Sequence, residues 1–374
     1  MASQSAATVI IFFALGILSP SFTSASRTGP FVPFRVYDAI YSFGDSIADT
    51  GNLIREGLGP FGAINQFPYG ETYFGKPTGR CSDGRLIIDF LADRFGLPYI
   101  NPYLDQNTSF INGVNFAVAG ATALDASYLE KTGILMPFTN SSLSVQLNWF
   151  EKHLNKSLCS GATQCTEKLS RALFLVGEIG GNDYNYAFFQ GKTIEEVAAT
   201  LVHQVVQSIM EAARNVIQHG ARHLFVPGNF PIGCMPSYLT SFGSTNSSDY
   251  DERRCLKHFN EFAQLHNDLL QRSLQSLREE FPNVNILYAD YYNAALEILD
   301  NASNYLAGFD ESSLLKACCG AGGDYNFNAT RMCGSPGTSA CSNPSKHLSW
   351  DGIHMTEEGY RDMVAFLFVG NLKG

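Results

Sequence analysis

Two short segments at opposite ends of the sequence carry side chains that a serine hydrolase needs. Ser46 follows Gly44-Asp45, directly after the apolar run Ile40–Phe43, whose β-branched and aromatic residues are typical of a buried strand. Glycine and small polar residues at the end of such a strand favour a turn that presents a side chain at the edge of a sheet. Ser46 is therefore our candidate nucleophile, with a plain structural turn as the alternative.

Near the C-terminus, Asp351 and His354 stand three residues apart, with Gly352 between them. The glycine allows the carboxylate to meet one imidazole nitrogen, which leaves the other nitrogen free to act as a base. Thr356 then matches the N-cap of a last helix. We expect Ser46 to attack a carbonyl, His354 to take its proton and Asp351 to orient the imidazolium. The alternative is that Asp351 and His354 only shape this turn.

Small residues and one amide follow two further predicted strands. Ala119-Gly120-Ala121-Thr122 allows a backbone N–H group to approach a ligand closely, and Asn182 stands among glycines that favour a fixed turn. The backbone N–H groups of Ser46 and Gly120, with the amide of Asn182, are the donors we expect in an oxyanion hole. A helix start packed on the sheet and an ordinary Asx turn are the respective structural alternatives.

Apolar runs that read as strands alternate with amphipathic runs that read as helices, which predicts parallel strands joined by crossover helices. This pattern predicts one α/β domain with its functional groups at the carboxyl ends of the strands. The predicted strands are Ile40–Phe43, Gly113–Val118, Ala172–Val176, His223–Pro227 and Val284–Ala289. The predicted helices are Leu86–Arg94, Ile194–His219, one within Tyr250–Glu280, Asn293–Asn301 and Glu357–Leu372. Thr193 with Glu196 forms a capping box before the second of these helices.

Composition limits the class of protein. The chain has 374 residues, 45% of them hydrophobic, and a formal charge of −10, which argues against nucleic acid as a partner. Val9–Leu18 is an apolar run too short to span a bilayer but long enough for a secretory signal, so we assign residues 1–25 as a signal peptide and 26–374 as a single domain. We expect no stable membrane insertion, and export to the extracellular apoplast or the vacuole.

Cysteines and sequons agree with export. Among nine cysteines, Cys159 with Cys165, Cys234 with Cys255, and a set of four near the C-terminus are plausible disulfide partners, which leaves Cys81 over. The spacings lack the paired ligands of a zinc site, so we expect no metal. Six Asn-x-Ser/Thr sequons are candidate glycosylation sites, at Asn107, Asn140, Asn155, Asn246, Asn301 and Asn328.

The sequence has no Gly-x-Ser-x-Gly elbow, Walker loop or His-Glu-x-x-His motif. Its blocks around Ser46, Gly120, Asn182 and His354 instead resemble the plant GDSL esterase/lipase family, a secreted branch of the SGNH hydrolases. The resemblance spans roughly residues 36–372 and includes the stretches Pro77–Arg85, Val114–Thr122 and Asn229–Cys234. It implies a three-layer α/β/α fold of the SGNH type with a central, mostly parallel sheet, and ester hydrolysis without a cofactor.

Three residues depart from the family pattern: Ile47 replaces a leucine, Ala119 replaces a glycine and would narrow the oxyanion hole slightly, and Met355 replaces a proline. None removes a reacting group. Further family-like phrases, Gly70–Thr72, Gln146–Phe150 and Tyr288–Ala294, imply a small-molecule substrate, an acetyl-like ester of a plant specialised metabolite such as an alkaloid.

Four aromatic residues after Asn182 either line a pocket for that ligand or pack as core: Tyr184, Tyr186, Phe188 and Phe189. Two other functions remain open. An acyltransferase would pass the acyl group from Ser46 to an alcohol instead of water. A binding protein on an inactive hydrolase fold would lack a reacting residue, and none is missing.

Overall fold

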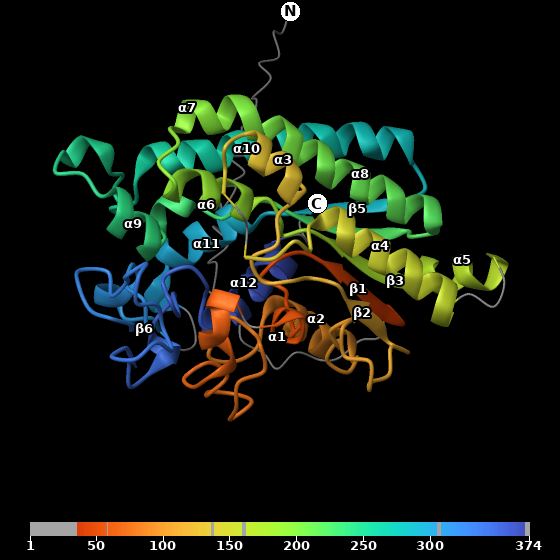
Figure 1. Cartoon of the computed structure of the whole chain (residues 1–374), viewed down its shortest axis with the longest axis horizontal. Coiled ribbons are helices and arrows are strands. Elements are labelled where there is room, and N and C mark those ends of the chain that lie inside the picture. Colours follow the sequence, from red (N-terminus) through yellow and green to blue (C-terminus); the bar gives the residue numbers. More distant parts are fainter. Residues whose placement is uncertain (1–35, 58, 136–137, 159–161, 305–307, 371–374) are drawn as a thin grey trace, which may run out of the picture. The chain divides into compact units, whose positions relative to one another are not determined.

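The main sheet is built from the predicted apolar runs. The computed structural model describes residues 36–57, 59–135, 138–158, 162–304 and 308–370. Within these residues, five parallel strands lie in the order β2-β1-β3-β4-β5 (Figure 1). They are β1 Ala39–Phe43, β2 Gly113–Asn115, β3 Ala172–Val176, β4 His223–Pro227 and β5 Asn285–Ala289. The strand that leads to Ser46 thus lies between two others and is held on both sides.

β2 is shorter than predicted, because side-chain amides bind the backbone that would continue it. The carbonyl groups of Asn115 and Ala117 accept hydrogen bonds from Nδ2 of Asn52, at 2.9 and 2.8 Å. The Asn115 side chain in turn accepts a bond from the backbone N–H of Ala117, at 2.9 Å. The chain still follows β1 after Asn115, but it leaves the regular strand at the point where the candidate site begins.

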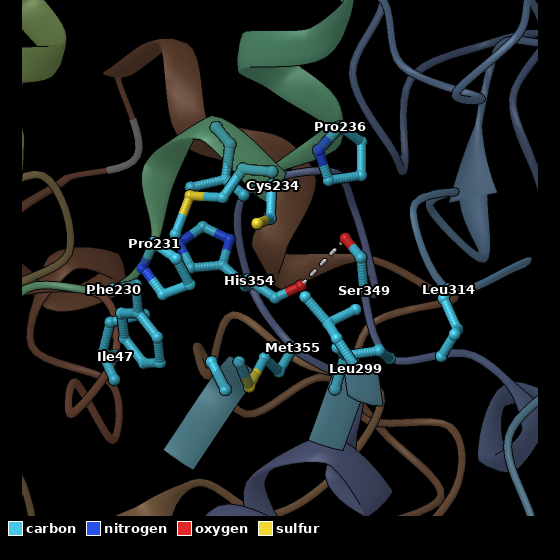
Figure 2. A pocket seen from close by; sticks show the side chains of 14 residues that line it. Ile47, Phe230, Pro231, Cys234, Pro236, Leu299, Leu314, Ser349, His354 and Met355 are labelled. Carbon is cyan, nitrogen blue, oxygen red and sulfur yellow. Dashed lines mark hydrogen bonds between the residues drawn. The ribbon is translucent and has the colours of Figure 1, made fainter. Parts of the chain in front are cut away.

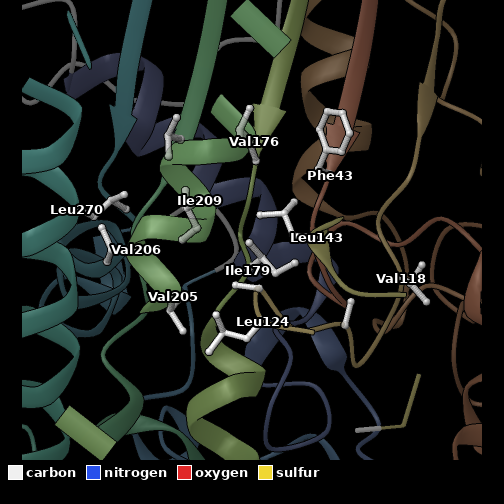
Figure 3. Close-up of a cluster of buried hydrophobic side chains, with 14 of the residues drawn as sticks. Phe43, Val118, Leu124, Leu143, Val176, Ile179, Val205, Val206, Ile209 and Leu270 are labelled. Atoms are coloured by element: carbon white, nitrogen blue, oxygen red, sulfur yellow. The ribbon is translucent and has the colours of Figure 1, made fainter. Parts of the chain in front are cut away.

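Two hydrophobic cores lie on opposite faces of the sheet, as alternation along each strand requires. In β1, Tyr41 and Phe43 belong to one core and Ile40 to the other. The larger core is covered by α4 Leu143–His153, α8 His203–His219 and α10 Lys257–Glu280, and the other core by α2 Ile87–Phe95, α11 Tyr291–Asp300 and α12 Glu357–Gly370 (Figure 1). Figure 3 shows part of the larger core, with Val206, Ile209 and Leu270 facing Val176. The result is the predicted three-layer α/β/α arrangement around a parallel sheet.

The long predicted helix from Ile194 to His219 is a single run with a wider turn inside it. α7 Ile194–Val197 leads through a π-helical segment, η3 Ala198–Val202, into α8. Its capping box is confirmed: the Glu196 N–H donates to Oγ1 of Thr193, and the Thr193 N–H donates to Glu196. The second long helix, α10, begins only at Lys257, because the residues before it are held in a disulfide-closed loop.

Shorter elements complete the described chain. The remaining helices are α1 Leu53–Glu56, α3 Ala126–Lys131, α5 Ala162–Ser170, α6 Gly181–Phe189 and α9 Pro236–Phe242. A small antiparallel sheet pairs β6 Cys319–Gly320 with β7 Ser339–Ala340. Short 3-10 or π-helical segments cover Gly59–Asn65, Leu154–Leu158, Ile232–Cys234, Ser247–Asp249, Ala302–Asn304, Glu311–Ser313 and Pro344–Lys346.

The cysteine pairing follows the predicted local sets. Disulfides join Cys234 to Cys255, Cys318 to Cys341 and Cys319 to Cys333. Cys165 is also disulfide-bonded, and its predicted partner Cys159 lies outside the described residues. Cys81 is the free cysteine of the described chain, and it is buried.

Two other predictions concern the surface and the N-terminus. The sequon residues Asn107, Asn140, Asn155, Asn246 and Asn328 are exposed, and Asn301 is half-buried. Among the described residues, no helix combines the length and the apolar character that a membrane span needs. The predicted signal peptide, residues 1–25, lies outside the described part of the chain.

Candidate active site

Ser46, His354 and Asp351 form a hydrogen-bonded chain at the carboxyl edge of the sheet. Nε2 of His354 lies 2.8 Å from Oγ of Ser46, and its Nδ1 lies 2.7 Å from Oδ2 of Asp351. With the proton on Nδ1, the ring donates to Asp351 and its Nε2 accepts the serine hydroxyl. The structure thus brings together two segments that are about 300 residues apart in the sequence.

The turn between Asp351 and His354 is fixed by the aspartate itself. Oδ1 of Asp351 accepts the backbone N–H groups of Ile353 and His354, at 3.0 and 2.8 Å, which leaves Oδ2 for the imidazole. Gly352 has φ of +96°, and a Cβ atom there would overlap the ring of Phe327. Thr356 caps α12 as predicted, because its Oγ1 accepts the N–H of Gly359 at 3.1 Å.

Tyr69 also belongs to this hydrogen-bonded chain, although no motif or spacing in the sequence indicated it. Its hydroxyl donates to Oδ2 of Asp351 at 2.9 Å, the same oxygen that meets His354. Its buried ring packs edge-on against Trp350, with centroids 5.9 Å apart. Burial acts to raise the pKa of Asp351, but the charge of His354 and the hydrogen bonds to the carboxylate outweigh it and hold that pKa below its ordinary value.

Gly120 and Asn182 lie beside Ser46, as the oxyanion-hole hypothesis requires. All three residues line the same cavity, and Gly120 has φ of +82°. The hydroxyl of Tyr186 donates to the carbonyl of Gly120 at 2.7 Å and holds this peptide in place. Nδ2 of Asn182 lies 3.0 Å from the carbonyl of Ala121 and 3.2 Å from a carboxylate oxygen next to the serine.

That neighbouring carboxylate is Asp45, and it is fully buried with a second carboxylate close by. Burial raises the pKa of Asp45 to about 7, although the Ile47 N–H and the charge of His354 act to lower it. Burial, and then the charge of Asp45, raise the pKa of Glu178 well above its ordinary value. Oε2 of Glu178 has no hydrogen-bond partner among the described residues. Two buried acids therefore line a small cavity together with Ser46 and Asn182.

A cavity of about 370 Å³ opens over Ser46 and His354, within the usual range for small-molecule sites. The aromatic residues after Asn182 divide between the two predicted roles: Tyr186 and Phe189 line this cavity, while Tyr184 and Phe188 pack in the core. The sequence did not indicate the other lining residues. These are Asn185 and Gln190 in or directly after α6, and Phe138, Met235, Ser237, Tyr238, Phe327, Ala329, Met332, Ile353 and Cys81 from other segments.

A second, apolar pocket of about 50 Å³ is also lined by His354. In Figure 2, Ile47 and Phe230 lie on one side of the imidazole, and Leu299 and Leu314 on the other. A third cavity, of about 30 Å³, adjoins Ser46 and is lined by Asp45, Glu178 and Asn182 among others. Ser46 thus lines the large cavity and the cavity of about 30 Å³, while His354 lines the large cavity and the apolar pocket.

The geometry and the family comparison agree. A family model described as GDSL-like lipase/acylhydrolase matches residues 40–367. The chain belongs to this family. Among curated GDSL relatives, acetylajmalan esterase of Rauvolfia serpentina is 48% identical over 338 residues, which are 90% of this chain and 86% of the relative. Acetylajmalan esterase 2 of the same plant is 49% identical, over 90% and 91% of the two chains.

A further GDSL relative is the GDSL esterase/lipase At1g28600 of Arabidopsis thaliana, 49% identical over 87% of this chain and 82% of its own. Among solved structures, phospholipase A1 from Streptomyces albidoflavus NA297 aligns over 90% of this chain and 100% of its own, at 12% identity and a TM-score of 0.35, which is too low to bear on function. Family membership and the esterase relatives make this GDSL protein a carboxylic ester hydrolase acting on small-molecule esters.

One group of potential metal ligands occurs in the described chain, away from this site. Cys318, Cys341 and His347 bring their ligand atoms within 4.8 Å of one another. Cys318 and Cys341 are joined in a disulfide, however, so neither supplies the thiolate that a metal binds. These residues do not fit a metal ion.

Proposed function

We propose that this protein hydrolyses a short-acyl ester, acetyl-like in size, of a plant specialised metabolite such as an alkaloid. The observation that carries the proposal is the chain Ser46–His354–Asp351 opening into an aromatic-lined cavity of about 370 Å³. Relatives at 48–49% identity are named acetylajmalan esterases, which supports an acetyl ester of an alkaloid as the substrate.

The proposed reaction runs through an acyl-enzyme. Oγ of Ser46 forms a bond to the carbonyl carbon while Nε2 of His354 takes the serine proton. The oxyanion accepts hydrogen bonds from the backbone N–H groups of Ser46 and Gly120 and from Asn182, whose longer contact to Asp45 it replaces. The imidazolium, oriented by Asp351, then protonates the departing alcohol. Water, deprotonated by His354, attacks the acyl-enzyme and releases the acid.

The large cavity supports a bulky, partly aromatic alcohol as the leaving group. Phe138, Tyr186, Phe189 and Tyr238 bring four aromatic rings to a space that His354 also lines. Such rings bind flat apolar rings and protonated amines, and an alkaloid presents both.

We also propose the compartment and the processing. Removal of residues 1–25 leaves a single hydrolase domain, 26–374, exported to the apoplast or the vacuole. The disulfides and the five exposed sequon residues support an oxidising, glycosylating route. Sequencing the N-terminus of protein secreted from plant cells, with and without glycosidase treatment, tests both points.

The substrate is tested with a panel of acetyl esters that differ only in the alcohol. Purified protein is given an acetylated indole alkaloid, an acetylated terpenoid and an acetylated sugar, and the freed alcohol is measured by mass spectrometry. We expect kcat/KM for the alkaloid ester to exceed that for the sugar ester by about tenfold or more. Equal values would contradict the proposed substrate class. Transfer of acetyl to an added alcohol in excess of free acetate would identify an acyltransferase instead.

A further inference from the structure

The three substituents of a tetrahedral adduct on Ser46 point toward different parts of the site. The oxyanion points toward Gly120 and Asn182, and the leaving oxygen points toward Nε2 of His354, from which it takes a proton. The acyl substituent takes the remaining direction. Of the three spaces at the site, the one of about 370 Å³ is lined by both Ser46 and His354, and it therefore fits the leaving alcohol. The apolar pocket of about 50 Å³ is lined by His354 but not by Ser46.

The cavity of about 30 Å³ fits the acyl substituent, because Ser46 and Asn182 line it and His354 does not. A group the size of a water molecule needs about 10–15 Å³ of such space, so about two or three groups of that size fit. The buried carboxyl groups of Asp45 and Glu178 line its inner side. An alkyl chain cannot extend in that direction without covering these polar groups.

On its outer side, this cavity meets the apolar pocket of about 50 Å³ shown in Figure 2. Four apolar side chains line both spaces: Ile47, Phe230, Met235 and Ile353. Met235 and Ile353 also line the large cavity, so they lie where all three spaces meet. The apolar pocket is further lined by the apolar side chains of Pro231, Leu299 and Leu314.

We propose that Met235 is a specificity-determining residue that, together with Ile353, closes the acyl side of the site against chains longer than about four carbons. This inference rests on the proposed esterase function and names its acyl class. The apolar pocket behind the wall has room for about three or four methylene-sized groups. With the Met235 side chain shortened, a longer acyl chain gains a path from Ser46 into an apolar space.

Met235 is suited to this test because it is not among the reacting groups. It lies between the 3-10 turn Ile232–Cys234 and α9, and its side chain is half-buried. A methionine is unbranched and adaptable, so replacement by leucine keeps its volume and replacement by alanine removes the wall.

The experiment measures kcat/KM for p-nitrophenyl acetate, butyrate and hexanoate, which vary the acyl group with a constant leaving group. The full chain is compared with Met235→Ala, with the volume-conserving Met235→Leu, and with Leu299→Ala, which enlarges only the far end of the apolar pocket. We expect the wild type to prefer acetate over hexanoate by about tenfold or more, and Met235→Ala to raise the hexanoate-to-acetate ratio by about tenfold. Met235→Leu and Leu299→Ala should leave that ratio within about threefold.

An unchanged ratio in an active Met235→Ala protein would overturn this inference alone, and so would a wild type that prefers hexanoate. No turnover of any ester by the wild type would overturn the proposed function, and this inference with it.

If Met235→Ala does not fold, the inference is tested on the wild-type protein with p-nitrophenyl phosphonates that carry either a methyl or a hexyl group on phosphorus. Ser46 Oγ bonds to phosphorus as p-nitrophenolate leaves. Inactivation about tenfold faster with a methyl than with a hexyl group supports the closed wall, and equal rates overturn it.

Discussion

The hydroxyl of Tyr69 donates a hydrogen bond to Oδ2 of Asp351, 2.9 Å away, across 282 positions of the sequence. The same oxygen lies 2.7 Å from Nδ1 of His354, so one carboxylate oxygen serves two donors. A carboxylate that accepts more hydrogen bonds is a weaker base. Tyr69 therefore moderates how strongly Asp351 attracts the imidazolium, and it fixes the direction of the carboxylate.

Tyr69→Phe removes this hydrogen bond and keeps the ring packed against Trp350. Asp351 then holds the imidazolium more tightly, so we expect the acid limb of the kcat/KM profile to move to higher pH. We also expect kcat to fall by about tenfold through looser positioning. A pH–rate profile of both proteins measures this. A variant with a lower kcat but an unmoved acid limb would show that Tyr69 only packs.

Asn182→Ala removes the one side-chain donor of the proposed oxyanion hole. We expect kcat for p-nitrophenyl acetate to fall by about 10²–10³ with little change in KM, because the interaction forms only in the transition state. Asn185→Ala is the matched control, since Asn185 lines the same cavity and its side-chain oxygen Oδ1 accepts a hydrogen bond from the Tyr238 hydroxyl. Equal losses in the two variants would contradict the assignment of Asn182.

Asp45 makes the stability of the fold depend on pH. Its pKa is raised to about 7 by burial, so the folded state holds a proton between about pH 4 and 7 that the unfolded chain has released. This contribution is fully present below about pH 4 and is lost as the pH rises toward 7. Urea unfolding measured across pH 4–8 should therefore show that the free energy of unfolding falls as the pH rises. The contribution of Asp45 to this fall is about 1.4 kcal/mol per pH unit or less.

Asp45→Asn keeps the shape of the side chain and cannot titrate. We expect the free energy of unfolding of this variant to fall less steeply between pH 4 and 7 than that of the wild type. Asp324→Asn changes an exposed carboxyl and serves as the control. If Asp45→Asn and the wild type kept parallel stability curves, Asp45 would be ionised throughout this range.

Arg80 and Asp89 form a buried, bidentate ion pair. Arg80 belongs to the family-like stretch Pro77–Arg85, and Asp89 follows that stretch in α2. Nε and Nη2 of Arg80 donate to the two oxygens of Asp89, at 2.8 and 2.7 Å. We expect Arg80→Leu to lower the free energy of unfolding by about 3–5 kcal/mol, because Asp89 would be left buried without its partner. Arg214→Ala, which breaks the exposed pair with Glu280, should lower the free energy of unfolding far less, because solvent screens an exposed ion pair. Similar urea midpoints for both variants would contradict this.

The local parts of this fold could be predicted from the sequence, because local patterns determine them. Strands β3 and β4 have the predicted bounds, and the capping box and the turn Asp351–His354 depend on residues a few positions apart. The early end of β2 was not predictable, because it depends on the side chain of the distant residue Asn52.

The candidate site likewise combines residues that local motifs predict with residues that only the folded chain brings together. The candidate catalytic residues lie in short motifs that the sequence shows, but Tyr69 reaches Asp351 from a distant segment that no motif or spacing links to it. Tyr184 and Tyr186 are two residues apart in one helix, and only the packing of α6 decides that the first is core and the second lines the cavity. Cavity walls such as Met235 come from loops whose positions depend on the whole fold.

The proposed esterase function requires an acyl-enzyme on Ser46, and rapid quenching with peptide mapping tests for this intermediate most directly. Wild-type protein and Ser46→Ala are mixed with p-nitrophenyl acetate, quenched in acid within the first turnover, digested and analysed by mass spectrometry. We predict one added acetyl group on the peptide that contains Ser46, none in the variant, and turnover lower by about 10³-fold or more in the variant. Acetyl on another residue, or a variant that keeps its turnover, would contradict the account.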